Sequence, residues 1–154
     1  MKIGFDLDGV LTDANIPLYR FIYYSLKEKD PDLYDVLRST YYNALKPLHS
    51  PELFLADGDE YYIITGRHSP ADDTVTREWC RKHCPNNKGV YIVGRDGRST
   101  DFTMAAKAKK IRELGIRVHF DDDPRIVDYL RNSLPDVTII QIGGVKTIKT
   151  MKDR

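Results

Sequence analysis

Short apolar runs alternate with segments of helical periodicity, and this alternation constrains the fold more than any other feature of the chain. The runs have the length and composition of buried strands. Their order predicts an α/β fold, in which a parallel sheet of about five strands lies between two layers of helices. The predicted strands span residues 2–7, 60–64, 89–93, 117–120 and 137–140, and the predicted helices between the later strands span 71–83, 102–114 and 124–134.

One long interval interrupts this order. Residues 11–59 separate the first strand from the second and are rich in tyrosine. Their pattern predicts two helices, at residues 16–29 and 31–45, with a hinge between them. We interpret residues 14–58 as a small helical insertion over the sheet, within a single domain that spans residues 1–154.

Composition indicates an ordinary soluble protein. Hydrophobic residues make up 41% of the chain, charged residues make up 31%, and the net charge is +1. A charge this small does not require a nucleic acid or a membrane as partner, although a local basic patch would still allow nucleic acid to bind. No apolar run is long enough to span a bilayer, and the N-terminus does not resemble a signal peptide. We therefore expect a cytoplasmic location and no membrane partner.

Acidic and hydroxyl side chains follow three of the predicted strands. The first strand leads into the segment DLDGVLT at 6–12, the second into TGR at 65–67, and the fourth into DDD at 121–123. Ligands of open parallel sheets bind beyond the carboxyl ends of the strands. We therefore expect these side chains to converge on one rim of the sheet.

Converging carboxylates repel one another. Two unit charges 4 Å apart cost about 4 kcal/mol at an effective dielectric constant of 20. A shared proton or a bound cation relieves this repulsion. Oxygen ligands without histidine or cysteine favour a hard ion such as Mg²⁺. A carboxylate can also act as a nucleophile and form an aspartyl-phosphate.

Four elements together resemble the haloacid dehalogenase (HAD) superfamily. They are DLDGVLT at 6–12, IITGR at 63–67, a helix that carries lysines, and FDD at 120–122. They occur in the order of that family, at its strand ends, and span nearly the whole chain. The resemblance implies a Rossmann-like HAD fold. It also implies a Mg²⁺-dependent phosphatase that hydrolyses a phosphate monoester through an aspartyl-phosphate.

The resemblance also implies the catalytic roles. Asp6 would attack phosphorus, and Asp8 would protonate the leaving oxygen and then activate water. Mg²⁺ would be held by Asp6, by the backbone carbonyl of Asp8, by Asp121, and by Asp122 directly or through water. Thr65 would hold a phosphoryl oxygen with its hydroxyl group.

The remaining substrate contacts fall on Gly66, Arg67 and the lysine of the motif. Arg67 is interpreted either as a substrate clamp or as a surface charge. Lys107 precedes Asp121 by fourteen residues, and this spacing favours it as the motif lysine, with Lys110 as the alternative. His68, next to Arg67, is interpreted as an ordinary polar residue.

The insertion is short for a cap. A small cap leaves the site open to bulky substrates, or a partner subunit, such as the second copy in a homodimer, completes the closure. Thr76, Trp79 and the segment DDDP at 121–124 add a weaker resemblance to deoxyribonucleotidases. We therefore favour a nucleotide or another small phosphometabolite as substrate. A nucleic-acid end, a phosphoprotein, and a catalytically silent binding protein with this fold are the alternatives.

Overall fold

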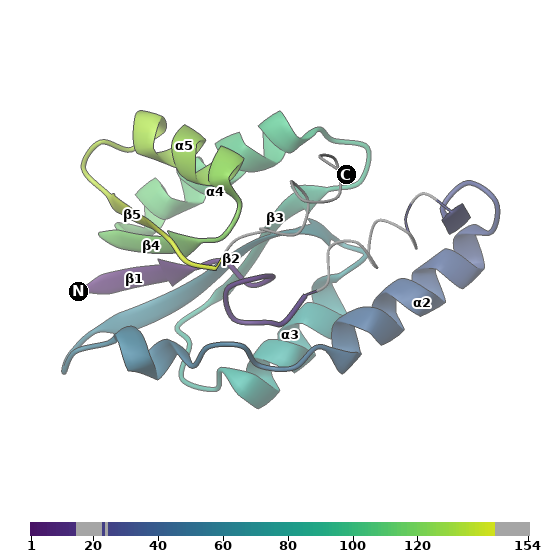
Figure 1. The fold of residues 1–154 in the computed structure, drawn as a ribbon, viewed down its shortest axis with the longest axis horizontal. Coiled ribbons are helices and arrows are strands. Elements are labelled where there is room, and N and C mark those ends of the chain that lie inside the picture. The colour runs from purple at the N-terminus through teal and green to yellow at the C-terminus, as the bar shows by residue number, and fades with distance from the viewer. Residues whose placement is uncertain (15–22, 24, 144–154) are drawn as a thin grey trace, which may run out of the picture.

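A parallel five-stranded sheet forms the centre of the computed structural model, which describes residues 1–14, 23 and 25–143 (Figure 1). The strands lie in the order β3-β2-β1-β4-β5, and every pair is parallel. The chain therefore builds outward on one side of β1 and then returns to its other side, which creates a switch point where such sheets bind ligands. The strands are β1 (Lys2–Phe5), β2 (Glu60–Ser69), β3 (Val90–Arg95), β4 (Val118–Asp121) and β5 (Thr138–Gln141).

Helices cover both faces of the sheet. Helix α3 (Asp73–His83) lies on one face, and helices α4 (Thr100–Leu114) and α5 (Pro124–Ser133) lie on the other (Figure 1). The predicted three-layer α/β fold is confirmed. Side chains at the amino ends of α4 and α5 cap the helices, because the Ser99 hydroxyl and the Asp123 carboxylate accept backbone N–H bonds.

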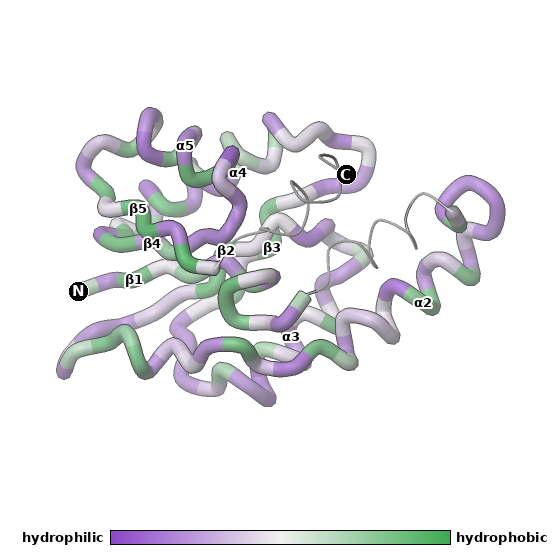
Figure 2. Tube along the Cα trace, in the orientation of Figure 1, coloured by the Kyte–Doolittle hydropathy of each residue, from purple (hydrophilic) through white to green (hydrophobic). Residues whose placement is uncertain are grey.

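The sheet divides the hydrophobic core into two clusters. Along β2, Tyr61 and Ile63 belong to the cluster on the α3 face, which includes Trp79. Tyr62 and Ile64 belong to the cluster on the face of α4 and α5. This alternation follows from the two-residue period of a strand. Figure 2 shows apolar residues recurring along the strands, which both helical layers bury.

Strand β2 is longer than predicted. The prediction ended it at residue 64, whereas it continues to Ser69, so that residues 65–67 lie within the strand and not after it. The extension forms because β2 keeps pairing with β3, with a bulge between Thr65 and His68. Gly94 allows this close approach, since a Cβ atom there would lie 2.3 Å from the carbonyl oxygen of Gly66.

The described part of the insertion packs against α3. Helix α2 (Pro31–Ala44) begins where predicted, capped by Asp30, and a 3₁₀ helix, η1 (Pro51–Phe54), follows it. Arg38 of α2 forms a buried ion pair with Asp72, with 2.5 Å between Nη2 and Oδ2. Most of the predicted helix at 16–29, and the basic tail at 144–154, lie outside the described residues.

Two arginine side chains cover the outer edge of the sheet. The Gly89 carbonyl accepts a hydrogen bond from β2, so alternate carbonyls of β3 point away from the sheet. Arg77 donates to the carbonyl of Val90 at 3.0 Å. Arg95 donates to the carbonyls of residues 92 and 94 at 2.9 and 2.8 Å. The exposed acceptors of β3 are thus hydrogen-bonded to side chains of the same chain.

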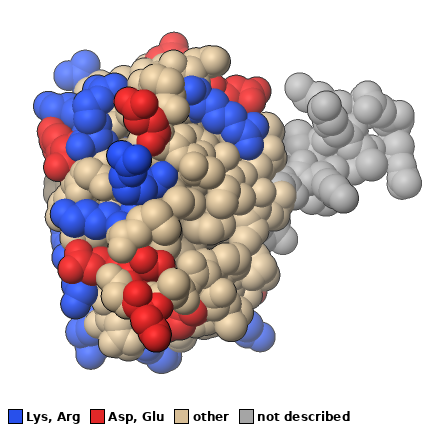
Figure 3. All heavy atoms as spheres, turned by 90° about the vertical axis from the view of Figure 1, so that its left-hand side faces the viewer, with Lys and Arg blue, Asp and Glu red and all other residues tan. Residues whose placement is uncertain are grey.

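The surface near the amino ends of the strands carries charges of both signs. Figure 3 shows this face, with lysine and arginine next to aspartate and glutamate. Within the described ranges, no helix combines the length and the apolar character that crossing a membrane would need.

Candidate active site

A cavity of about 440 Å³ opens beyond the carboxyl ends of the central strands. It is lined by residues of the loops after β1 and β4, the insertion, β2, α4 with the residues before it, and the first turn of α5. The expected site residues among them are Asp6, Asp8, Thr65, Gly66, Arg67, Lys107 and Asp122. Asp121 is fully buried beside this group. The fold therefore brings together side chains that are more than a hundred residues apart in sequence.

A buried lysine joins two of the carboxylates. Lys107 is 1% exposed, and its Nζ lies 3.0 Å from Asp6 Oδ1 and 2.6 Å from Asp121 Oδ2. Burial disfavours the charged amine, but the carboxylates of Asp121 and Asp6 outweigh burial and raise the pKa of Lys107 above its usual value. Lys107 is therefore a fixed positive charge next to the expected nucleophile.

Lys110 lies elsewhere. Its Nζ is 2.6 Å from Glu113 Oε2, and the side chain lines a separate surface hollow with Tyr91. The two lysines differ in position because they lie on different faces of α4. Lys107 lies on the buried face with Ala108 and Ile111, and Lys110 does not. The expected substrate contact of Lys110 is therefore not supported by its position.

Three carboxylates lie close enough to share a cation. Oxygen atoms of Asp6, Asp121 and Asp122 all lie within 4.8 Å of one another. Burial raises the pKa of Asp6 well above its usual value, an effect that Lys107 opposes and that the neighbouring carboxylates reinforce. Burial and the Asp121 carboxylate raise the pKa of Asp122 to about 7. Burial also disfavours ionised Asp121, but Lys107, which is closer to it than to Asp6, lowers its pKa.

A hard cation fits this cluster. One lysine does not balance three carboxylates, and all the donor atoms are oxygens, which suits Mg²⁺. Gly9 provides the space for one of them, since a Cβ atom at this position would lie 2.1 Å from Asp122 Oδ2. Gly9 also has a φ of +84°, which disfavours other residues. Asp6, Asp121 and Asp122 would hold the ion, and the expected contribution of the Asp8 backbone carbonyl stays a prediction.

Arg67 holds the carboxylate of Asp8. The guanidinium contacts both carboxylate oxygens, at 2.8 Å from Nε to Oδ2 and 2.7 Å from Nη2 to Oδ1. The remaining nitrogen, Nη1, donates to Thr76 at 3.1 Å, and the ring of Tyr42 lies 3.8 Å from the guanidinium carbon. Arg67 is only 3% exposed, so the interpretation of Arg67 as a surface charge is wrong. Thr12 donates a further hydrogen bond to Asp8, whose side chain is 27% exposed and reaches the cavity.

Thr65 and Gly66 both line the cavity. Thr65 is 1% exposed and accepts a 3.3 Å hydrogen bond from the backbone of Arg67. Gly66 faces α4, and a Cβ atom there would lie 3.1 Å from Thr103. Gly66 is therefore positioned next to α4, the helix that carries Lys107.

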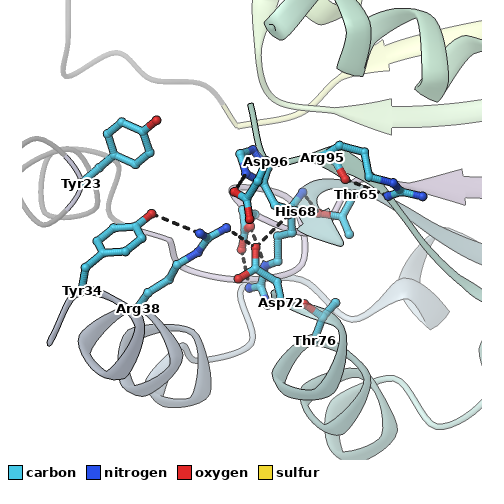
Figure 4. Close-up of polar contacts among 12 residues, drawn as sticks. Tyr23, Tyr34, Arg38, Thr65, His68, Asp72, Thr76, Arg95 and Asp96 are labelled. Carbon is cyan, nitrogen blue, oxygen red and sulfur yellow. Dashed lines mark hydrogen bonds and ion pairs between the residues drawn. The ribbon is translucent and has the colours of Figure 1, made fainter. Parts of the chain in front are cut away.

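Much of the outer wall was not predicted. Tyr23, one of the insertion tyrosines, and His68 belong to it, and Figure 4 shows His68 beside Asp96. No motif indicates these positions, because they come from separate segments that only the folded chain brings together. The other wall residues are Ala14, Tyr41, Tyr42, Arg98, Ser99, Thr100, Thr103, Asp123, Arg125 and Ile126.

Sequence comparisons add nothing to this geometry: no protein-family model matches the chain, and no curated protein matches it in sequence. Solved structures do match. A protein of the Pnkp1/Rnl/Hen1 RNA repair complex superposes with a TM-score of 0.62 at 16% identity over 92% of this chain, which spans only 42% of that protein.

Two further structures match this chain over most of their length. A HAD-superfamily hydrolase of subfamily IA from Geobacter sulfurreducens has a TM-score of 0.55 at 13% identity, with 91% of this chain and 85% of that chain covered. A HAD family enzyme from Bacteroides thetaiotaomicron, an aspartate-to-alanine mutant in complex with magnesium and inorganic phosphate, has a TM-score of 0.55 at 11% identity, with 97% of each chain covered. The fold of this protein is therefore that of the HAD hydrolases.

Proposed function

We propose that this protein is a Mg²⁺-dependent phosphatase that hydrolyses a phosphate monoester through an aspartyl-phosphate. The observation that carries the proposal is the arrangement of Asp6 beside buried Lys107, with Asp121 and Asp122 within reach of a shared cation. The magnesium in the matched Bacteroides structure supports the choice of ion.

In the first half of this reaction, an Asp6 carboxylate oxygen attacks phosphorus and the bond from phosphorus to the leaving oxygen breaks. Asp8 donates a proton to the leaving oxygen, which hydrolysis of an ester with a poor leaving group requires. Lys107 and the Thr65 hydroxyl hold phosphoryl oxygens. When bound, Mg²⁺ supplies further positive charge against the phosphate.

In the second half, water attacks phosphorus, and the bond between phosphorus and Asp6 breaks. Asp8 now accepts the proton of that water, which returns both aspartates to their starting state. Because Arg67 contacts both oxygens of Asp8, it fixes the direction of this carboxylate through both halves.

Hydrolysis of para-nitrophenyl phosphate with Mg²⁺ or with EDTA tests the proposal. We expect metal-dependent release of phosphate by the wild type. Asp6→Asn should abolish turnover while Mg²⁺ binding persists, and Asp128→Asn, on the exposed side of α5, should behave as the wild type. A folded protein without metal-dependent turnover of any ester would support the silent binding protein instead.

A second candidate substrate is a nucleic-acid end. The first structural match belongs to an RNA repair complex, and the open cavity carries Arg98 and Arg125 on its wall. Comparing kcat/KM for mononucleotides with that for oligonucleotides bearing a terminal phosphate discriminates the two. A preference of at least about tenfold, equivalent to 1.4 kcal/mol, would decide between them.

A further inference from the structure

His68 lines the cavity, and the reaction proposed above gives it no role. Its side chain is 23% exposed, so it is neither in the core nor free in solvent. It stands at the end of the bulge in β2, directly after Arg67. Bulges redirect side chains and occur often next to active sites. The position of this ring on the cavity wall therefore follows from the irregular pairing of β2 with β3.

The orientation of the His68 ring is determined on two sides. Nδ1 lies 2.8 Å from Asp96 Oδ1. Figure 4 shows the two side chains next to each other. On the opposite edge, Cδ2 lies 2.9 Å from the place that a Cβ atom of residue 94 would occupy, so Gly94 makes room for the ring. The ring is thus held between β3 and the loop that leads to α4.

The partner of Nδ1 determines the chemistry of the other nitrogen. The hydrogen bond from His68 lowers the pKa of Asp96, which makes Asp96 a carboxylate and an acceptor. Nδ1 therefore carries the proton, and in the neutral ring Nε2 is an acceptor with a lone pair. Within residues 1–14, 23 and 25–143, no hydrogen bond to Nε2 is formed.

The cavity has room for more than a phosphate group. Pockets of roughly 300–1,000 Å³ hold whole small molecules, and this cavity measures about 440 Å³. Asp8, which faces the leaving oxygen in the proposed reaction, is held by Arg67, the residue before His68. His68 and Asp8 line the same cavity, so a leaving group whose ester oxygen faces Asp8 occupies the cavity that His68 lines.

We propose that His68 is a specificity-determining residue, whose Nε2 accepts a hydrogen bond from a hydroxyl group adjacent to the phosphate ester. The preferred leaving group is then a sugar or polyol. This inference rests on the proposed function, because it names what the phosphatase site binds beyond the phosphate.

Matched substrates that differ by one hydroxyl group test the inference. Adenosine 3′-monophosphate has a hydroxyl next to its ester and 2′-deoxyadenosine 3′-monophosphate lacks it. 2-Hydroxyethyl phosphate and ethyl phosphate form a second pair without a base. One hydrogen bond should give the hydroxylated member of at least one pair an advantage of about five- to tenfold in kcat/KM.

Two variants of His68 test the roles of the two ring nitrogens separately. The side-chain amide of asparagine occupies the position of Nδ1, so His68→Asn keeps the contact with Asp96. The side-chain amide of glutamine occupies the position of Nε2, so His68→Gln keeps a polar group towards the cavity. His68→Asn should remove the preference, and His68→Gln should retain part of it. His83→Phe, on α3 and outside the cavity, is the control and should retain all of it.

Para-nitrophenyl phosphate, which has no adjacent hydroxyl, distinguishes loss of the contact from damage to the site. His68→Asn should lose about five- to tenfold more kcat/KM on the hydroxylated ester of a pair than on para-nitrophenyl phosphate, whereas damage to the site should lower both alike. Equal kcat/KM for both members of both pairs in the wild type would overturn the inference while leaving the phosphatase intact. A preference that survives in His68→Asn would also overturn it. Failure to hydrolyse any ester would reject the proposed function, and this inference with it.

Discussion

Replacing Lys107 by methionine should destabilise the protein strongly, because it removes the ammonium group that pairs with two buried carboxylates. Lys107 is 1% exposed, Asp121 is fully buried, and Asp6 is 7% exposed. Methionine keeps the length of the apolar stem but not the ammonium group, so fully buried Asp121 has no water to replace the lost partner, and Asp6 has only its contact with the cavity. Removing one member of a buried ion pair typically costs about 3–5 kcal/mol.

A loss of this size is easily measured by thermal unfolding. For a chain of this length, 1 kcal/mol corresponds to a shift in Tm of about 2–4 °C, so Lys107→Met should lower Tm by about 6–20 °C in EDTA. Mg²⁺ should raise the Tm of the variant more than that of the wild type, because the cation replaces part of the missing charge.

Lys110→Met is the matched control on the same helix. Its ammonium group pairs with Glu113 at a partly exposed site, with side-chain exposures of 30% and 43%. Such pairs contribute about 0–1 kcal/mol, so Tm should fall by less than about 4 °C. Equal losses of stability in the two variants, or a Lys107→Met protein as stable as the wild type in EDTA, would refute the reasoning.

Three further predictions concern the groups around the lysine. Gly9→Ala should weaken Mg²⁺ binding by at least about tenfold in calorimetric titration, because the new Cβ atom displaces Asp122. Gly58 has a similar φ of +83°, but a Cβ atom there would meet no other atom within 4 Å, so Gly58→Ala should leave the affinity for Mg²⁺ unchanged. Arg67→Lys should lower kcat by about 10- to 100-fold with little change in KM, since lysine cannot contact both oxygens of Asp8; an unchanged kcat would contradict that positioning role. Burial and a neighbouring carboxylate raise the pKa of Asp122 to about 7 in the folded state. The metal-free protein should therefore lose stability as pH rises from about 4 to about 7. Mg²⁺ should raise Tm more at pH 8 than at pH 5, because Asp122 is then ionised. Equal Mg²⁺ effects on Tm at both pH values would count against a shared cation.

The sheet and its helices could be predicted from the sequence because both depend on local patterns. Five apolar runs and the helices between them identify the layers, and the rule for parallel sheets places the motif residues at one rim. The convergence of Asp6 and Asp121 required only that each follow or end a central strand. The neighbours β1 and β4 then bring the two carboxylates to the same lysine.

Other features depend on contacts that no local pattern contains. The extension of β2 to Ser69 requires β3 beside it and a glycine at position 94. The burial of Arg67 depends on α2 and α3, which supply Tyr42 and Thr76 around its guanidinium. The choice between Lys107 and Lys110 depends on the rotation of α4 about its axis. For the same reason, the wall residue His68 could not be recognised before the elements were assembled.

The arginine side chains over β3 also bear on how the protein behaves at high concentration. A free strand edge is a template on which another chain can add a strand, and such additions lead to aggregates. At β3, an incoming strand would first have to displace Arg77 and Arg95 from three carbonyl acceptors. Two charged groups would then need new partners, which makes the addition unfavourable. This edge of the sheet is thereby protected from intermolecular pairing by side chains of the same protein.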